Sequence, residues 1–515
     1  MWVDQVECLI DSLPVSLRRR TVLKALGAAA VGLPAIEDER RRAVVIGTGF
    51  GGSVTALRLA RAGVPTLVLE RGLRWPARPG GNTFPRLFAP DKRASWLAPG
   101  PVMTGSPLAA WAPYTGVLER VRGRGMDILC GAGVGGGSLV YHGMTIQPSE
   151  EAFARSMPPG MDWTAFDQDF YRRVASKLRP APIPRDLLGV RQYRAAKMFH
   201  DQVSGKGLRP FRVPLPMDWD VVRRELRGEL PPSYSTGDVI YGANNAGKRT
   251  LDVTYLAEAE ATGLVHVQTL TLVRDIERAK DGRWVVHVDR ITTGGRVAAR
   301  KRIVTDALFL GAGSAGTTRL LVKAKAKNLI PDLPDGVGKH WGNNGDRIFA
   351  WTPPGDSPGA LQGGPACVGV REPTLTIIHG PVPFPLDLGT TSLIGFGLVE
   401  PLGEFRYDAG KDDAVLYWKQ EYDARLTTAI RDRITGIVGG SLLIDTTRFD
   451  TTTYHPLGGA VIGAVCDRYG RVRDQRGLYV TDGALIPGST GACNPSMTIA
   501  ALAERNMDAI LPEVI

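Results

Sequence analysis

Cysteine is scarce and scattered in this sequence. The five residues (Cys8, Cys130, Cys367, Cys466 and Cys493) form no C-x-x-C pair and have no zinc-site spacing, so we expect buried free thiols and no metal. Aromatic residues are few, at 7%, and no run of Lys and Arg is interleaved with them. A nucleic-acid platform needs both features. We therefore interpret the net charge of +11 as arginine-rich composition and expect no nucleic-acid partner.

The first forty residues have no apolar run long enough to cross a bilayer. Arg18, Arg19 and Arg20 precede an apolar run of roughly a dozen residues, whereas a spanning helix needs about 20. Arg19 to Lys24 resembles a twin-arginine export signal, a pathway that carries folded, cofactor-loaded proteins. The alternative is a basic, Ala-rich leader on a cytoplasmic protein. The cleavage site is poor, so export and a cytoplasmic location both stay open.

A glycine-rich motif lies between two predicted strands near the N-terminus. β-Branched residues up to Ile46 predict a buried parallel strand, "SVTALRLARAGV" has apolar residues at helical spacing, and "PTLVLERG" predicts a second strand. In such a β-α-β unit Gly47 permits the tight turn, Gly49 lets the backbone approach a pyrophosphate, and Gly52 lets helix and strand pack closely. The helix N-terminus offers free N–H groups to the phosphates. The unit predicts a dinucleotide site.

Glu70 ends the second predicted strand. A carboxylate at this position accepts hydrogen bonds from the adenosine ribose and repels a 2′-phosphate, which argues against NADP. The motif does not separate NAD from FAD, so that choice depends on other segments.

Three further segments favour a flavin. "GAGVGGGSLVYHGM" (131–144) holds too many glycines for a helix or strand interior and suits a backbone pressed against a flat ligand. "DALFLGAGSAGTTRLL" (306–321) predicts a strand, a turn and a helix that return to the same sheet. "GLYVTDGALIPGSTGACNPSMTIAALAERN" (477–506) predicts a strand ending in Asp482 and a helix from about Thr498. The carboxylate suits a ribityl or ribose hydroxyl, and the helix N-terminus suits a flavin's pyrimidine carbonyls.

These motifs in combination resemble the glucose-methanol-choline oxidoreductases. The similarity also rests on "HPLGG…YGRV…LYVTDGALIPGS…NPSMTIAALAERN", and it extends from about Arg42 to the C-terminus. "NNAGKRTLDVTYL" (244–256) and "GVGKHWGNNGD" (336–346) are similar to one branch of the family, the bacterial cholesterol oxidases that hold FAD without a covalent bond. The resemblance implies non-covalent FAD as the cofactor.

The resemblance also implies an α/β fold in which a Rossmann-like FAD-binding domain is joined to an α+β substrate domain, whose antiparallel sheet lies over the flavin. We expect the leader at 1–39 and the FAD-binding domain at 40–72, 120–150, 245–330 and 450–515. The substrate-binding domain would take 73–119, 151–244 and 331–449. Pro-rich stretches near 76–116 and 353–390 are typical of loops that act as lids.

Two catalytic residues follow from the resemblance, His455 in "YHPLGG" and Asn494 in "CNPSM". A histidine side chain is suited to moving the alcohol proton, and the Asn494 amide can orient the alcohol oxygen or polarise the reduced flavin. The expected contacts of FAD are Gly47, Gly49, Phe50, Gly51, Gly52, Glu70, Gly133, Gly136, Gly137, Ser138, Val273, Gly311, Asp482, Gly483, Asn494, Pro495 and Met497.

Two departures from the family pattern concern the substrate. Cholesterol oxidases of this branch carry a glutamate before Pro-x-Pro that relays a proton during steroid isomerisation, whereas here Ile378 takes its place with His379 beside it. Where the family has Asn-Gly near the flavin, this chain has Tyr141-His142. Three roles stay open for this pair: covalent attachment of FAD through His142, a hydrogen bond to substrate or flavin, or simple packing.

We therefore expect FAD-dependent oxidation of a secondary alcohol on a hydrophobic sterol-like or polycyclic substrate. Hydride transfer to flavin N5 would give a ketone, with O2 as acceptor giving H2O2, and without the isomerisation. The alternatives are a dehydrogenase with another electron acceptor, a redox-neutral isomerase or cyclase of secondary metabolism, and a non-catalytic lipid-binding relative. We also expect a monomer that contacts membranes transiently to collect its substrate.

Overall fold

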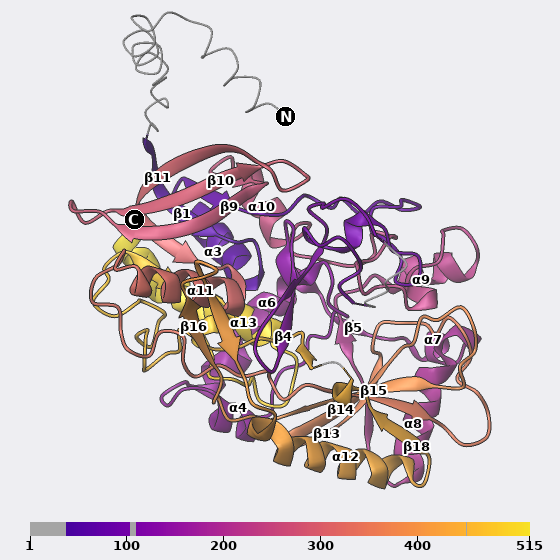
Figure 1. Ribbon diagram of the computed structural model, residues 1–515. Coiled ribbons are helices and arrows are strands. Elements are labelled where there is room, and N and C mark those ends of the chain that lie inside the picture. The colour runs from indigo at the N-terminus through magenta and orange to yellow at the C-terminus, as the bar shows by residue number, and fades with distance from the viewer. Residues whose placement is uncertain (1–37, 104–109, 450) are drawn as a thin grey trace, which may run out of the picture. The chain divides into compact units, whose positions relative to one another are not determined.

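The computed structural model of the chain describes residues 38–103, 110–449 and 451–515, and two sheets organise this part (Figure 1). The leader with its predicted twin-arginine signal, and Cys8, lie outside the described residues. Cys130, Cys367, Cys466 and Cys493 carry free thiols. Within the described ranges, a search for helices with the length and apolarity of a membrane span finds none.

The first sheet has seven strands in the order β8-β2-β1-β11-β10-β9, with β20 beside β11. The pairs β1–β2, β2–β8 and β11–β20 are parallel, whereas β9, β10 and β11 form an antiparallel meander. Its strands are β1 (Asp38–Ile46), β2 (Thr66–Leu69), β8 (Val265–Gln268), β9 (Thr271–Arg278), β10 (Trp284–Ile291), β11 (Val297–Leu310) and β20 (Leu478–Val480).

Four helices pack on or near this sheet: α3 (Phe50–Arg61), α10 (Tyr255–Ala261), α11 (Gly313–Ala326) and α13 (Ser496–Val514). α3 contacts both α10 and α13, and most of its residues are buried. Because α3 follows β1 directly and β2 returns parallel to β1, the segment forms the predicted β-α-β unit. The C-terminal helix α13 brings the last residues of the chain back to the first unit.

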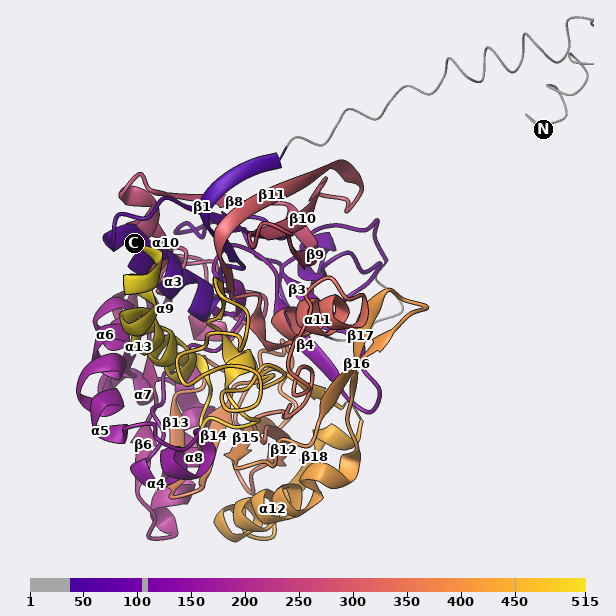
Figure 2. The same cartoon turned by 90° about the vertical axis from the view of Figure 1, so that its left-hand side faces the viewer.

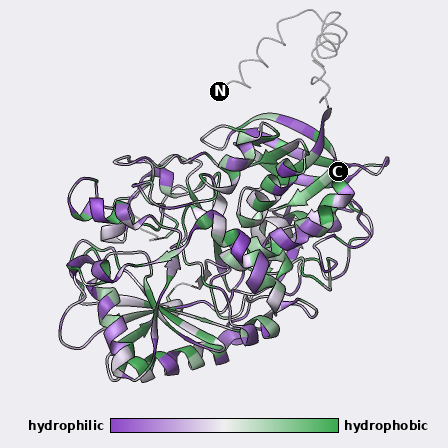
Figure 3. Cartoon of the chain, turned by 180° about the vertical axis from the view of Figure 1, so that it is seen from behind, coloured by the Kyte–Doolittle hydropathy of each residue, from purple (hydrophilic) through white to green (hydrophobic). Residues whose placement is uncertain are grey.

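The second sheet has six antiparallel strands in the order β18-β12-β15-β14-β13-β6. These strands are β6 (Pro210–Arg212), β12 (Arg347–Thr352), β13 (Val368–Glu372), β14 (Leu375–Gly380), β15 (Thr391–Gly397) and β18 (Leu442–Asp445). Two helices, α8 (Arg194–Gly205) and α12 (Ala424–Val438), pack against strands of this sheet and against each other. In Figure 3 the strands of this sheet, at the lower left, are largely hydrophobic, whereas the surrounding helices alternate between hydrophobic and hydrophilic residues.

Smaller elements connect the two sheets. β3 and β4 form a hairpin joined by β19, and the β16–β17 hairpin lies beside α11 (Figure 2). The remaining strands and α-helices are β3 (Leu118–Val121), β4 (Asp127–Gly131), β5 (Ala181–Pro182), β7 (Pro214–Leu215), β16 (Glu404–Asp408), β17 (Asp413–Tyr417), β19 (Thr452–Thr453), α4 (Glu150–Ser156), α5 (Trp163–Ala165), α6 (Tyr171–Leu178), α7 (Arg185–Leu188) and α9 (Trp219–Leu226).

The predicted class, α/β with a second antiparallel sheet, is confirmed. The first sheet draws its strands from segments assigned to the FAD-binding domain, and the second from segments assigned to the substrate-binding domain. Two separate buried clusters accompany the sheets, one around β1, α3 and α13 and the other around β12 to β15 and α8. The division into two domains at the stated boundaries stays a prediction.

Candidate active site

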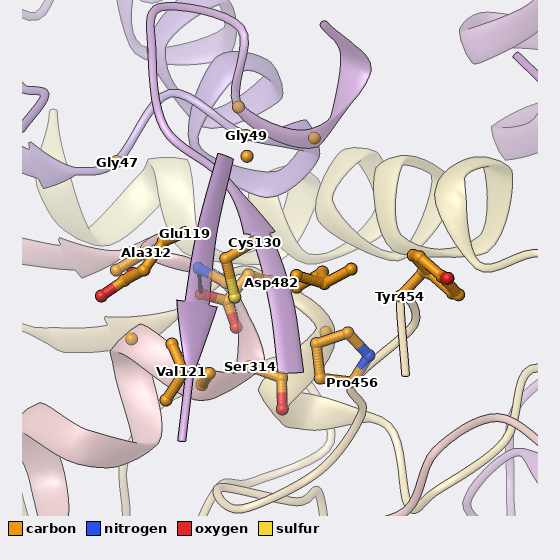
Figure 4. A pocket seen from close by; sticks show the side chains of 18 of the residues that line it. Gly47, Gly49, Glu119, Val121, Cys130, Ala312, Ser314, Tyr454, Pro456 and Asp482 are labelled. Carbon is orange, nitrogen blue, oxygen red and sulfur yellow. Dashed lines mark hydrogen bonds between the residues drawn. The ribbon is translucent and has the colours of Figure 1, made fainter. Parts of the chain in front are cut away.

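A cavity of about 620 Å³ extends from the glycine turns of the first sheet to the second sheet. We call the part around Gly47, Gly49, Gly51 and Gly311 the glycine end. The part beneath β12 and β15, lined by Ile348, Ile394 and Phe396, is called the sheet end. In Figure 4, Ala312 and Glu119 lie on one side of the cavity and Tyr454 on the opposite side.

At the glycine end the backbone segments pack closely, because glycine has no side chain to keep them apart. Gly47 has φ of +94°, and a Cβ there would lie 2.4 Å from the Gly311 carbonyl oxygen. A Cβ on Gly51 would lie 1.9 Å from the Thr481 oxygen, and one on Gly52 would lie 2.1 Å from the Gly47 oxygen. Larger residues at these positions would push α3 away from the strand ends, so the sequence allows the helix N-terminus to reach the cavity.

Three helix N-termini meet at the cavity wall. The first residues of α3, α11 and α13 are among those that line the cavity. Free N–H groups and the partial positive charge at such ends favour a pyrophosphate or an electron-rich carbonyl. A Cβ on Gly137 would meet no described atom within 4 Å, although this residue lines the cavity. Helix ends and open glycines together fit a long, flat, anionic cofactor such as FAD.

Two buried carboxylates face the glycine end. Glu70 accepts hydrogen bonds from the Thr48 hydroxyl and the Gly72 N–H, the latter at 2.8 Å, and burial raises its pKa. Asp482 accepts from the Gly313 N–H at 2.9 Å and the Ala484 N–H at 2.8 Å, and burial raises its pKa to about 6. Both retain acceptor capacity for ribose or ribityl hydroxyls.

A charged group that the sequence analysis missed also lines the glycine end. Arg71 pairs with Glu119 of β3, and Arg319 of α11 pairs with Asp413 of β17. Each pair joins segments far apart in the chain, so no local motif marks it. Figure 4 shows Glu119 and Cys130 on the neighbouring strands β3 and β4.

At the sheet end His455 is held by an aspartate. Its Nδ1 lies 2.9 Å from Asp346 Oδ2 and 3.0 Å from Oδ1. The His455 side chain is 19% exposed and that of Asp346 is 7% exposed. Both residues line the cavity, and the imidazole ring lies 5.8 Å from the ring of Phe396. Asp346, which ends the segment "GVGKHWGNNGD", was not singled out from the sequence.

Asn494 lines the cavity, but its amide is already engaged by the protein. Nδ2 donates to the Met144 carbonyl and to Ser496 Oγ at 2.7 Å, and Oδ1 accepts from the Ile146 N–H at 3.2 Å. These bonds use both amide hydrogens. In this arrangement Asn494 fixes the 144–146 backbone, and it would have to give up a contact to donate to an alcohol oxygen.

Tyr141 and His142 both line the cavity. The Tyr141 hydroxyl and His142 Nδ1 are buried, and neither has a hydrogen-bond partner among the described residues. Burial raises the pKa of Tyr141. Burial first, and then electrostatic interaction with Lys248 and His455, lowers the pKa of His142 to about 4, so the His142 ring is neutral at physiological pH. Two buried polar groups without a partner, carried by residues that line a cavity, suggest contact with a ligand's polar atoms.

Lys248 contacts the backbone that carries Tyr141. Its ammonium donates to the carbonyls of Leu139, at 3.0 Å, and Tyr141, and it lies 4.7 Å from the centre of the Tyr141 ring. Burial lowers the pKa of Lys248 to about 7. The lysine therefore fixes the backbone of the glycine-rich segment next to the ligand.

Ile378 and His379 do not line the cavity. Ile378 is opposite Ile394, a cavity residue, so the two share a face of the sheet. His379 alternates to the other face, where its Nε2 lies 3.1 Å from Thr391 Oγ1. Burial lowers the pKa of His379 to about 3. A proton relay at this place of the sheet has no support from the geometry.

Most predicted site residues gather around the one cavity. The predicted FAD contacts that line it are Gly47, Gly49, Phe50, Gly51, Glu70, Gly136, Gly137, Val273, Gly311, Asp482, Gly483, Asn494 and Pro495. Four others lie behind the lining, namely Gly52, Gly133, Ser138 and Met497. Ser138, for example, accepts from the Leu251 N–H at 3.0 Å and donates to the Gly135 carbonyl at 2.7 Å.

Known proteins share this architecture. Residues 440–503 match the family model described as GMC oxidoreductase. The chain is 27% identical to a cholesterol oxidase of Mycobacterium tuberculosis, covering 90% of this chain and 89% of that protein. It is 24% identical to a cholesterol oxidase of Acinetobacter baumannii, covering 91% and 94%.

A solved structure has the same fold. Pyridoxine 4-oxidase from Mesorbium loti superposes with a TM-score of 0.62 and 15% identity, over 91% of this chain and 99% of that one. At this identity the likeness concerns the fold alone. In its C-terminal segment and along most of its length, the chain is therefore similar to the GMC oxidoreductases, which are FAD-dependent flavoenzymes.

Proposed function

We propose that this protein oxidises a secondary alcohol on a hydrophobic, sterol-like or polycyclic substrate to the ketone. The observation that carries the proposal is a histidine, His455, at the sheet end of a cavity whose walls there are largely apolar. The sheet end is lined by Ile348, Ile394 and Phe396, and further apolar residues of the cavity include Met103, Ile240 and Pro381. Relatives named cholesterol oxidase add support for a bulky apolar alcohol.

The reaction removes a hydride and a proton from the alcohol. FAD held at the glycine end would supply the acceptor for the hydride of the carbinol carbon and the route for the electron pair to the final acceptor. His455 takes the hydroxyl proton, since an imidazole is suited to that transfer near neutral pH. Asn494 holds the 144–146 backbone in place. The apolar walls exclude water from the reacting carbon.

We propose dioxygen as the acceptor, which takes two electrons and two protons to give H2O2. The oxidase names of the relatives support this choice. The alternative is a dehydrogenase that passes electrons to another acceptor. Stopped-flow reoxidation of the reduced flavin by air separates them, because reoxidation that takes minutes would reject the oxidase.

The isomerisation step is absent from this proposal. Ile378 has no proton to relay, and His379 is buried on the sheet face turned away from the cavity. The product should therefore keep its carbon–carbon double bonds where the substrate has them. A shifted double bond in the product, found by NMR or ultraviolet absorbance of the enone, would overturn this part.

A redox-neutral isomerase or cyclase is the second candidate. The unsatisfied Tyr141 hydroxyl and His142 Nδ1 favour it, because they can hold a polar group of an activated intermediate. The product mass decides between the candidates. A product equal in mass to the substrate supports the second candidate, and the loss of two hydrogens supports alcohol oxidation.

We also propose transient membrane contact for collecting substrate. Phe88, Leu386 and Leu388 are 46%, 67% and 55% exposed. Phe88 packs edge-on against Phe384, three residues after the cavity residue Pro381. Co-sedimentation with neutral lipid vesicles tests this point. A monomeric state is a further proposal, and for the location both twin-arginine export and a cytoplasmic protein stay open.

Anaerobic titration of the purified, yellow protein tests the central proposal. A panel of sterols, polycyclic alcohols and short linear alcohols is added while the visible flavin absorbance is followed. Bleaching by bulky apolar alcohols, and not by short ones, supports the proposal. Bleaching by short alcohols alone would overturn the assigned substrate class.

A further inference from the structure

We infer that Asp346 is a positioning residue that sets the tautomer of His455. This inference rests on the proposed function, in which His455 accepts the alcohol proton. Nδ1 of His455 lies within 3.0 Å of both carboxylate oxygens of Asp346. An ionised carboxylate only accepts hydrogen bonds, so Nδ1 carries the hydrogen and Nε2 keeps a free lone pair. Nε2 is then the nitrogen that takes the proton.

The carboxylate itself is held in place. Thr453 Oγ1 lies 3.3 Å from Asp346 Oδ2, and the same hydroxyl accepts a hydrogen bond from the main-chain N–H of His455 at 3.2 Å. Asn344 Nδ2 lies 3.4 Å from Asp346 Oδ1 and donates to the Cys493 carbonyl at 2.8 Å. Asn344 therefore links Asp346, which holds His455, to Cys493, the neighbour of Asn494. One hydrogen-bonded network thus positions both predicted catalytic residues.

The neighbouring arginine does not occupy this carboxylate. Arg347 pairs with Asp423 and donates to Thr427 Oγ1 at 2.6 Å. Its contact with Asp346 goes to the main-chain carbonyl. The charge of Arg347 is thus compensated by Asp423, and the Asp346 carboxylate is left to face the imidazole.

Two other titratable groups, His142 and Lys248, lie near His455, and neither takes the place of Asp346 beside the imidazole ring. His142 is neutral, because burial lowers its pKa to about 4. Lys248 lies behind the 139–141 backbone, and burial lowers its pKa to about 7. When His455 takes the alcohol proton, the imidazolium that forms lies against the carboxylate, which stabilises it electrostatically.

Two substitutions at one position separate tautomer control from a general structural role. In Asp346→Asn the amide nitrogen can donate to Nδ1, which favours the tautomer with hydrogen on Nε2, the wrong nitrogen for a base. In Asp346→Ala no partner imposes a tautomer. We expect flavin bleaching by substrate to be slower on the order of 10²-fold in Asp346→Asn. Asp346→Ala should be less impaired than Asp346→Asn.

Asp445 provides the matched control. It is as buried as Asp346, pairs with Arg431, and accepts the Thr447 N–H, but it does not line the cavity. Asp445→Asn measures the cost of neutralising a buried aspartate near Asp346 but outside the cavity lining, and the rate of bleaching should stay within about twofold of the unmodified protein. FAD content, from the ratio of visible to ultraviolet absorbance, is measured for every variant.

A readout that needs no turnover completes the test. ¹⁵N-histidine NMR of the holoprotein distinguishes the two ring nitrogens, and His455→Ala identifies the signal by its loss. We expect hydrogen on Nδ1 in the unmodified protein and on Nε2 in Asp346→Asn. Hydrogen on Nε2 in the unmodified protein, or an Asp346→Asn variant that bleaches as fast as Asp445→Asn, would overturn the inference. If His455→Ala bleaches normally, the proposed function itself fails.

Discussion

The glycine end and the sheet end of the cavity are built in different ways. At the glycine end, backbone groups and helix N-termini form the wall, and the key residues are those that lack a side chain. At the sheet end, side chains of β12 and β15 form the wall, and His455 and Asp346 supply polar groups. Tyr141 and His142 also line the cavity, and the Tyr141 ring lies 5.6 Å from that of Phe50. The first arrangement recognises a constant cofactor, whereas the second can change with the substrate while the fold is kept.

The difference also appears in how the polar groups are satisfied. Glu70 and Asp482 at the glycine end accept hydrogen bonds from the protein, so the cofactor site is preorganised. The Tyr141 hydroxyl and His142 Nδ1 have no partner among the described residues. Buried polar groups are costly without partners, so we expect a bound ligand to stabilise this part of the cavity wall.

The largest expected effect lies at the glycine end. Gly51→Ala places a Cβ 1.9 Å from the backbone oxygen of Thr481, and backbone atoms cannot move aside cheaply. We expect the variant to lose bound FAD, measured as the ratio of visible to ultraviolet absorbance. Gly436→Ala in the exposed part of α12 is the control, since a Cβ there meets no described atom within 4 Å. Its free energy of unfolding should rise by about 0.5–1 kcal/mol. A fully yellow Gly51→Ala protein would show that the close packing is not required.

The next effect concerns catalysis alone. His455→Ala should slow anaerobic bleaching by at least about tenfold and leave FAD bound, because the His455 side chain lies at the sheet end. Stopped-flow absorbance at saturating substrate gives the rate. Bleaching at the unmodified rate would mean that another group carries the proton.

A smaller effect is expected for the Tyr141 hydroxyl. If it binds a polar atom of the substrate, Tyr141→Phe should raise KM by about threefold to tenfold and change kcat little. Tyr193→Phe is the matched control, because the Tyr193 hydroxyl donates to the Gly364 carbonyl at 3.1 Å and Tyr193 does not line the cavity. Equal KM values for both variants would assign Tyr141 to packing. A change in the flavin spectrum without a change in KM would assign its hydroxyl to the cofactor.

The smallest effect is a pH dependence of stability. The pKa of His142 is lowered to about 4, so between about pH 6.5 and 4 the unfolded chain binds a proton that the folded protein does not. Stability is therefore lost as the pH falls through this window, by about 1–2 kcal/mol at pH 5. Denaturant unfolding at pH 7.5 and 5 should show this loss in the unmodified protein and less of it in His142→Gln. Identical losses in both would place the ring in a more solvated setting.

The sequence was sufficient for the glycine turns and the helix that follows them, because local patterns determine these features. The spacing of Gly47, Gly49 and Gly52 between two strands and a helix predicted the β-α-β unit, which the structure contains. The antiparallel second sheet came from the family resemblance. In both cases the signal lies in consecutive residues or in a long shared motif.

The sheet end depends on contacts between distant segments, which no local pattern reveals. Asp346 and His455 are 109 positions apart and meet only because β12 starts beside the loop before "HPLGG". Distant segments also meet at the glycine end, where Arg71 pairs with Glu119 and Arg319 pairs with Asp413, and the sequence analysis missed both pairs for the same reason. The family segment ending in Asp346 was visible in the sequence, and its acidic last residue was the one signal for a histidine partner.

Anaerobic flavin reduction by a panel of bulky and short alcohols, with mass analysis of the product, tests the central claim most directly. The account predicts that a bulky apolar alcohol bleaches the flavin and leaves a ketone two hydrogens lighter. A protein that stays yellow with every alcohol, or a product of unchanged mass, would contradict it.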